Sequence, residues 1–219
     1  MDSKENTFNY EALKMAAKFD PMAARFLSRL ECDTYDKFIL MLYKDIEATL
    51  ALIEKTASLR QNDGEDRLSI EIINILIGAG YLASHDQYIN GHSDIVVTFN
   101  SFTWIGEAKI HSSYDYLMEG FMQLCDRYST GNENDCEGGL IFYIKGNNAL
   151  EVVEKWKADL ITRNVAGLKT FRCNNRKNLS FYSTHTHSKS GLTYKVRHFG
   201  VILGFNPTDK SARSAKKNN

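Results

Sequence analysis

The run GHSDIVVTFNSFTWIGEAKI, residues 91–110, decides how this chain folds. It is rich in β-branched and aromatic residues on both sides of Asn100-Ser101, so it predicts two antiparallel strands joined by a tight turn. Strict pairing about that turn places Asp94 directly opposite Glu107, on one face of the hairpin. The period-2 alternation of a strand places Lys109 on the same face. Two carboxylates and an ammonium group are therefore expected to converge at the end of a hairpin.

Such a patch is unusual on two mostly apolar strands. Two neighbouring carboxylates repel each other, so one of them stays protonated unless a cation compensates their charge. Mg²⁺ does this with one or two carboxylates while it keeps several waters. Lys109 beside the ion is suited to orient or deprotonate an attacking water, or to stabilise charge on a phosphate. The alternative is a surface ion pair of Glu107 and Lys109 with a solvated Asp94.

The spacing of these residues is similar to a known signature. Asp94, twelve intervening residues and Glu107-Ala108-Lys109 resemble the PD-(D/E)xK motif of the restriction-endonuclease-like nuclease superfamily, with Ser93 in place of the Pro. The similarity extends over residues 61–160 and is to bacterial nucleases of restriction and phage-defence systems. It implies an α/β fold, with a mixed β-sheet core flanked by helices. It also implies an endonuclease that hydrolyses phosphodiester bonds of DNA with Mg²⁺, for which Mn²⁺ can substitute.

The resemblance implies two further site residues. The superfamily often carries another metal-organising acid on the helix before the hairpin. Glu65 falls inside the apolar arc of the helix predicted over residues 65–79, whereas Glu71 falls on its polar side. Glu65 is therefore the expected third acid and Glu71 the second choice, and the alternative for Glu65 is a capping box with Asn62. A Gln of the helix after the second strand lies near the active site of relatives, and Gln123 matches it.

Three parts of the chain are expected. Residues 1–60 read as an N-terminal helical segment that packs on the domain, forms a homodimer or binds a partner defence protein. The polar break Gln61-Asn62-Asp63-Gly64 is the predicted boundary. The nuclease domain then covers residues 61–205, and residues 206–219 are expected to form a basic, disordered tail.

The formal net charge is zero, but the charges are unevenly placed. Residues 151–219 carry fourteen Lys and Arg against four Asp and Glu, which leaves an acidic excess of ten in residues 1–150. This asymmetry indicates an anionic partner for the C-terminal part, and we expect DNA. The candidate phosphate contacts are Arg172, Arg176, Lys177, Lys195 and Arg197. For each of them the alternative is a solvated polar edge.

The sequence contains no apolar run that spans a bilayer, no signal-peptide pattern, and four cysteines without metal-like spacing. These features predict a cytoplasmic protein with buried thiols and no membrane partner. The competing function is a catalytically silent module of the nuclease fold that binds nucleic acid or a partner protein. A missing acid or lysine would favour that function, and the motif here is complete.

Overall fold

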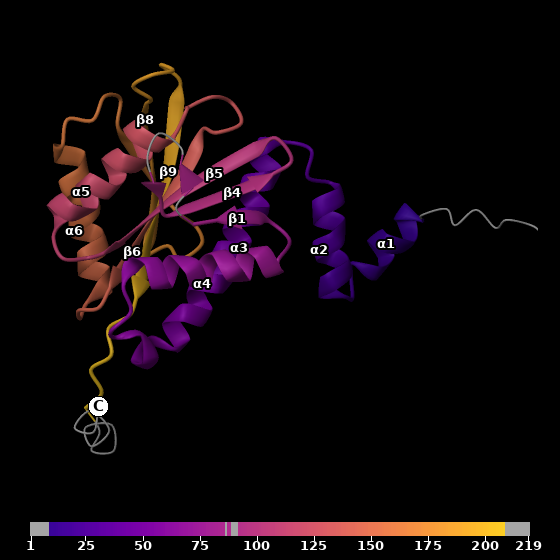
Figure 1. Ribbon diagram of the computed structural model, residues 1–219, viewed down its shortest axis with the longest axis horizontal. Coiled ribbons are helices and arrows are strands. Elements are labelled where there is room, and N and C mark those ends of the chain that lie inside the picture. The colour runs from indigo at the N-terminus through magenta and orange to yellow at the C-terminus, as the bar shows by residue number, and fades with distance from the viewer. Residues whose placement is uncertain (1–8, 86, 89–91, 209–219) are drawn as a thin grey trace, which may run out of the picture. The chain divides into compact units, whose positions relative to one another are not determined.

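The computed structural model describes residues 9–85, 87–88 and 92–208 of the chain (Figure 1). Contacts divide the chain into two compact units, Met1–Tyr43 and Lys44–Asn219. The first unit contains α1 (Tyr10–Ala16), α2 (Pro21–Leu30) and the beginning of α3 (Tyr35–Lys55). Most of the predicted basic tail, residues 209–219, lies outside the described residues.

Side-chain caps define the first two helices. The Asn9 side chain accepts a hydrogen bond from the Ala12 N–H and begins α1. The Asp20 carboxylate accepts from the Met22 N–H, and Pro21 is the first residue of α2. Pro suits this position because its missing N–H would have no partner there and its φ is already helical. The helices α1 and α2 therefore lie on the two sides of Asp20-Pro21.

The second unit is built on a seven-stranded sheet in the order β1-β4-β5-β6-β9-β8-β7. Its strands are β1 (Leu82–Ser84), β4 (Ile95–Phe99), β5 (Phe102–Ile110), β6 (Glu137–Ile144), β7 (Lys169–Arg172), β8 (Ser180–Thr186) and β9 (Thr193–Ile202). β6 runs parallel to β5 and β9, and the other neighbours are antiparallel. A separate pair consists of β2 (Gln87–Tyr88) and β3 (His92–Ser93). The predicted mixed α/β class is confirmed.

Helices cover the sheet. Those of the second unit that lie wholly within it are η1 (Ala57–Arg60), α4 (Glu65–Gly78), α5 (Tyr114–Met122), η2 (Gln123–Tyr128) and α6 (Ala149–Thr162). α5 and α6 contact each other and lie on one face of the sheet (Figure 1). Their apolar side chains pack with residues of β5, β6, β8 and β9 in one cluster, which includes Phe121, Phe142, Trp156 and Phe181. This cluster is the core on which the candidate site is built.

Glycines allow β5 and β6 to pack closely with an aromatic ring. Gly106 of β5 and Gly139 of β6 are register partners. A Cβ at Gly106 would lie 2.6 Å from the Trp104 ring, and one at Gly139 would lie 2.4 Å from it. The fully buried Trp104 ring therefore occupies the space that two side chains would otherwise fill. This packing fixes the position of Gly106, the residue directly before Glu107.

The division between the units lies earlier than the expected boundary between residues 60 and 61. Two ion pairs join the second half of α3 to the far side of the sheet. Glu47 pairs with Arg197 of β9, and Glu54 pairs with Arg176. Because residues 44–60 make these contacts, they belong to the same unit as the sheet. The polar break at residues 61–64 is a loop inside this unit.

Candidate active site

The hairpin has the register that its sequence predicts. Phe99 pairs with Phe102 across the turn, and Ile95 pairs with Gly106 at the other end of the ladder. Asn100 in the turn has a φ of 55°, in the left-handed region that Asn tolerates better than most residues. Asp94 directly precedes β4, so one further step of the same register places it opposite Glu107.

Asp94 is fixed to the neighbouring strand by its side chain. Its Oδ2 accepts a hydrogen bond of 2.8 Å from the N–H of Ala108. Burial raises the pKa of Asp94, and the Ala108 N–H and the Lys109 charge act in the opposite direction. Since Ala108 lies between Glu107 and Lys109 in sequence, this bond joins all three motif residues into one group.

Glu107 and Lys109 form a buried ion pair on β5. The Lys109 Nζ lies 2.5 Å from Glu107 Oε1, and the two residues are 2% and 7% exposed. The other carboxylate oxygen, Glu107 Oε2, is buried without a hydrogen-bond partner. Burial and the nearby Asp94 raise the pKa of Glu107 to about 7. Burial lowers the pKa of Lys109, but Glu107 and the other carboxylates outweigh it, so the net shift is upward.

Glu65 joins three elements next to this pair. It is the first residue of α4, and its Oε1 accepts a hydrogen bond of 2.6 Å from the Ile110 N–H. The Tyr116 hydroxyl of α5 donates to the same carboxylate at 3.0–3.1 Å. The N-cap of α4 is Gly64, which offers no side-chain cap, so the capping box with Asn62 is absent.

Glu71 has a different environment. It forms a two-pronged ion pair with Arg60 of η1. Both of its oxygens therefore have an arginine partner within the fold. Of the two acids considered from the sequence, only Glu65 is brought next to the end of β5.

Gln123 lies where the helix after the hairpin changes its geometry. The helix after the second strand of the hairpin is α5, and it is followed by the π-helix η2, which begins at Gln123. The Gln123 Oε1 is buried without a hydrogen-bond partner. α5 packs tightly on β5, because a Cβ at Gly120 would lie 2.9 Å from Lys109 Cγ. Single π-helical turns in α-helices often occur at functional sites.

Sequence reasoning missed two residues beside Asp94. Donor atoms of Asp66, His85 and Asp94 all lie within 4.8 Å of one another. Asp66 is the second residue of α4, and His85 directly follows β1. No periodic pattern marks either residue, because only the tertiary packing of α4 on β1 brings them together. Tyr116 was missed for the same reason.

Three of the five candidate phosphate contacts have carboxylate partners. Arg197 is 1% exposed and pairs with Glu47, so it is unsuited to contact a ligand. Arg176 pairs with Glu54 at 2.6 Å. Lys195 pairs with Glu137 at 2.7 Å. All three are engaged by carboxylates within the fold, which makes them less suited than Arg172 and Lys177 to contact a phosphate.

The other two candidates, Arg172 and Lys177, are exposed and lie together. They line a hollow of about 420 Å³ between α6 and the strands β7 and β8, together with Lys157. Arg172 of β7 and Glu107 of β5 lie in one row of register partners that crosses the sheet. The row has one residue on each of the strands between them, β6, β9 and β8. Four steps of about 4.8 Å separate their strands by roughly 19 Å. Register partners point to the same side of a sheet, so Arg172 and Glu107 lie on one face.

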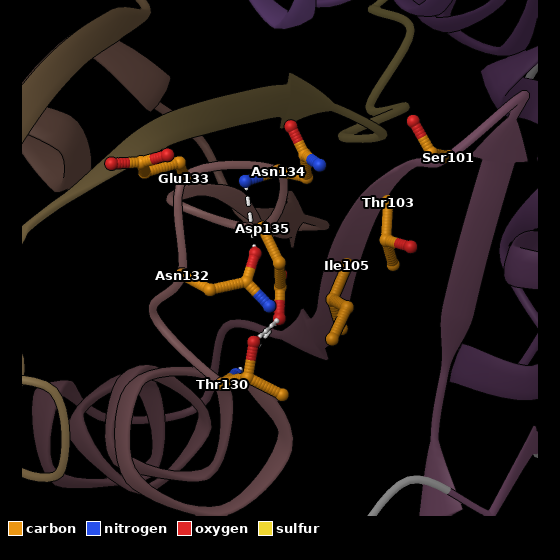
Figure 2. Close-up of a pocket in the computed structure, with 8 residues that line it drawn as sticks. All are labelled: Ser101, Thr103, Ile105, Thr130, Asn132, Glu133, Asn134 and Asp135. Carbon is orange, nitrogen blue, oxygen red and sulfur yellow. Dashed lines mark hydrogen bonds between the residues drawn. The ribbon is translucent and has the colours of Figure 1, made fainter.

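A second hollow, of about 390 Å³, lies along β5 next to the candidate site (Figure 2). Ser101, Thr103 and Ile105 line one wall and alternate on the strand in phase with Glu107. The opposite wall comes from residues 130–135, where Asp135 accepts bonds of 2.8 Å from the N–H and hydroxyl of Thr130. The eight lining residues include two acids and no Lys or Arg, so their charge does not favour a phosphate.

Comparisons with protein-family models, curated proteins and solved structures find no match to this chain. In the part of the chain that the structure describes, none of the helices has the length and apolar character needed to cross a membrane.

Proposed function

We propose that this protein is a metal-dependent endonuclease of the PD-(D/E)xK class, with a restriction-endonuclease-like fold, that hydrolyses phosphodiester bonds of DNA. One observation carries the proposal. The Asp94 carboxylate is held on the N–H of Ala108, between Glu107 and Lys109, so both acids and the amine meet at one end of the hairpin. Phosphoryl transfer needs mainly charge neutralisation and in-line positioning, which such a group supplies.

The residues fit a divalent cation. Glu107 Oε2 is buried with no hydrogen-bond partner, and an uncompensated buried carboxylate oxygen is costly. Burial and Asp94 raise the pKa of Glu107 to about 7, as expected where two acids share a site without a bound ion. Asp94 and Glu107 would hold Mg²⁺ or Mn²⁺, and Glu65 would orient the shell. A bound ion would supply Lewis-acid activation of the phosphate and of water.

The other residues have separate tasks. Lys109 places its ammonium group against Glu107 and beside the reacting phosphate, where it stabilises negative charge on the non-bridging oxygens. Its position is set by Glu107 on its own strand and by Gly120 of the helix above. The Gln123 amide, with its free oxygen, positions Lys109 or the substrate. The hydrogen bond from the Ile110 N–H to Glu65 holds the first residue of α4 against β5. It keeps Glu65, the third acid, near the pair of Glu107 and Lys109.

A role in bacterial restriction or phage defence rests on the resemblance of the motif segments alone. We propose that the N-terminal helices bind a second copy of the chain or a partner defence protein, because two sites cut both strands of a duplex most simply.

The alternative is a catalytically silent module that binds nucleic acid or a partner protein. It is favoured by the burial of the pair, since Glu107 and Lys109 are only 2% and 7% exposed. A catalytic pair has to reach the scissile phosphate.

The full-length chain should be incubated with supercoiled plasmid, linear duplex DNA and RNA, in Mg²⁺, Mn²⁺ or EDTA. The proposed function predicts cleavage of DNA that needs a divalent ion and stops in EDTA. Absence of cleavage of all three substrates, together with no Mg²⁺ binding to the wild type by calorimetry, would support the silent module instead.

A further inference from the structure

A second group of possible metal ligands includes Asp94 and two residues from elements outside the hairpin. Its members are Asp66 of α4, His85 after β1, and Asp94 itself. We propose that Asp66, His85 and Asp94 form a binding site for a divalent first-row transition metal ion, with Mn²⁺ as the ion best matched to the set. The proposal deepens the proposed function, on which it rests, because Asp94 is common to both groups.

The distances fit an ion better than they fit direct contacts. His85 Nε2 lies 3.7 Å from Asp66 Oδ1, which is too long for a hydrogen bond. His85 Nε2 is also buried without a hydrogen-bond partner. Two ligand atoms that bind one ion at about 2.1 Å lie roughly 3.0–3.5 Å apart at right-angled or tetrahedral geometry. With all three donor atoms within 4.8 Å, small rotations of the side chains bring them to these separations.

A separate feature lies on the strand that faces Asp94. Glu107 lies opposite Asp94 in the hairpin register, and its Oε2 is buried with no hydrogen-bond partner. Glu107 is 2% exposed, so water satisfies this oxygen poorly. A cation bound to Asp94 would also lessen the cost of this unpartnered carboxylate oxygen across the hairpin.

The types of ligand decide which ion the group prefers. Mg²⁺ and Ca²⁺ take oxygen ligands, whereas imidazole nitrogen suits the first-row transition ions. Two of the three ligands are carboxylates, which suit Mn²⁺. His85 therefore makes the centre select Mn²⁺ over Mg²⁺, which the motif residues Asp94, Glu107 and Lys109 alone would not do.

The experiment is electron paramagnetic resonance of Mn²⁺ added to the full-length chain. Hyperfine coupling between bound Mn²⁺ and ¹⁴N reports an imidazole ligand directly and does not depend on cleavage. The variants are His85→Gln and Asp66→Asn, and His111→Gln is the matched control because His111 follows β5 and is also half-buried. The Asp66 side chain is 81% exposed, so its replacement leaves the fold intact.

We expect ¹⁴N coupling in the wild type and in His111→Gln, and its loss in His85→Gln. Mn²⁺ affinity should fall at least about tenfold in His85→Gln and in Asp66→Asn. Mutation of even an outer-shell partner of a metal ligand typically lowers metal affinity about 10–100-fold. Circular dichroism of each variant checks that it is folded.

Bound Mn²⁺ without ¹⁴N coupling would overturn this proposal and leave an all-oxygen nuclease site intact. Coupling that disappears in His111→Gln instead of His85→Gln would overturn it as well. If no Mn²⁺ binds, the proposal also fails, and the Mg²⁺-dependent cleavage assay then decides the proposed function separately.

Discussion

The N–H of Ala108 donates to Asp94 Oδ2 at 2.8 Å, across the open end of the hairpin. This bond holds an acid that lies just outside the β4–β5 ladder against the strand that carries Glu107 and Lys109. The hydrogen bond and the charge of Asp94 can be separated by mutation, because Asn keeps an acceptor oxygen and removes the charge.

Asp94→Asn should keep the bond to Ala108 and retain the stability of the fold, whereas Asp94→Ala should leave a partly buried N–H without a partner. We expect Asp94→Ala to lower the free energy of unfolding by about 1–3 kcal/mol relative to Asp94→Asn. Both variants should lose metal binding. Urea unfolding in EDTA measures the first quantity and calorimetry the second. Equal stabilities of the two variants would show that the bond contributes nothing.

The stability of the metal-free protein should fall as the pH rises toward and through 7. The pKa of Glu107 is raised from 4.5 to about 7, so the folded state holds a proton that the unfolded state releases between these values. The stabilisation is therefore complete below about pH 4.5 and is lost as the pH rises through 7. Each pKa unit corresponds to about 1.4 kcal/mol.

Glu107→Gln removes this proton equilibrium and should flatten the pH dependence of unfolding in EDTA. Urea titrations at about pH 5, 6, 7 and 8 cover the range over which this stability should be lost. A wild-type protein whose stability rises over this range, or a variant with an unchanged slope, would contradict the assigned environment of Glu107.

Gly120→Ala should displace Lys109. The added Cβ would lie 2.9 Å from Lys109 Cγ and 3.1 Å from its Cε. We expect the cleavage rate to fall by roughly 100-fold, because a displacement of about 1 Å at a reacting group has this effect. The matched control is Gly78→Ala at the end of α4, where a Cβ meets nothing within 4 Å. The control should retain activity and gain up to about 1 kcal/mol of stability.

Arg172→Ala and Lys177→Ala should each weaken DNA binding through the loss of one phosphate contact. The slope of log affinity against log salt should become shallower by about 0.9 for each contact removed from duplex DNA. Lys195→Ala is the control, since Lys195 already pairs with Glu137. Fluorescence anisotropy from about 50 to 200 mM salt measures the slopes. An unchanged slope in the first two variants would remove this hollow from the DNA-binding surface.

The hairpin could be predicted because its information is local. A two-residue turn and a period of two fix which residues face each other, and so Asp94, Glu107 and Lys109 follow from sequence alone. The helix that carries Glu65 was also predictable, from its apolar arc. The sequence did not show which residue each charged side chain pairs with.

Arg197 and Arg176 illustrate that limit. Each looks like a surface cation in a basic segment, but their partners Glu47 and Glu54 lie more than a hundred residues away in the chain. The same applies to His85, which meets Asp66 only because α4 packs on β1. Tertiary contacts of this kind leave no periodic trace in the sequence.

The central claim is that Lys109 acts in one catalytic group with Asp94 and Glu107. The most direct measurement is the rate of supercoiled plasmid cleavage in Mg²⁺ and Mn²⁺ by the wild type, by Lys109→Ala and by Lys195→Ala. The claim predicts a loss of at least about 100-fold in Lys109→Ala and near wild-type cleavage in Lys195→Ala. Metal-dependent cleavage that is equally fast in the wild type and in a folded Lys109→Ala would contradict it.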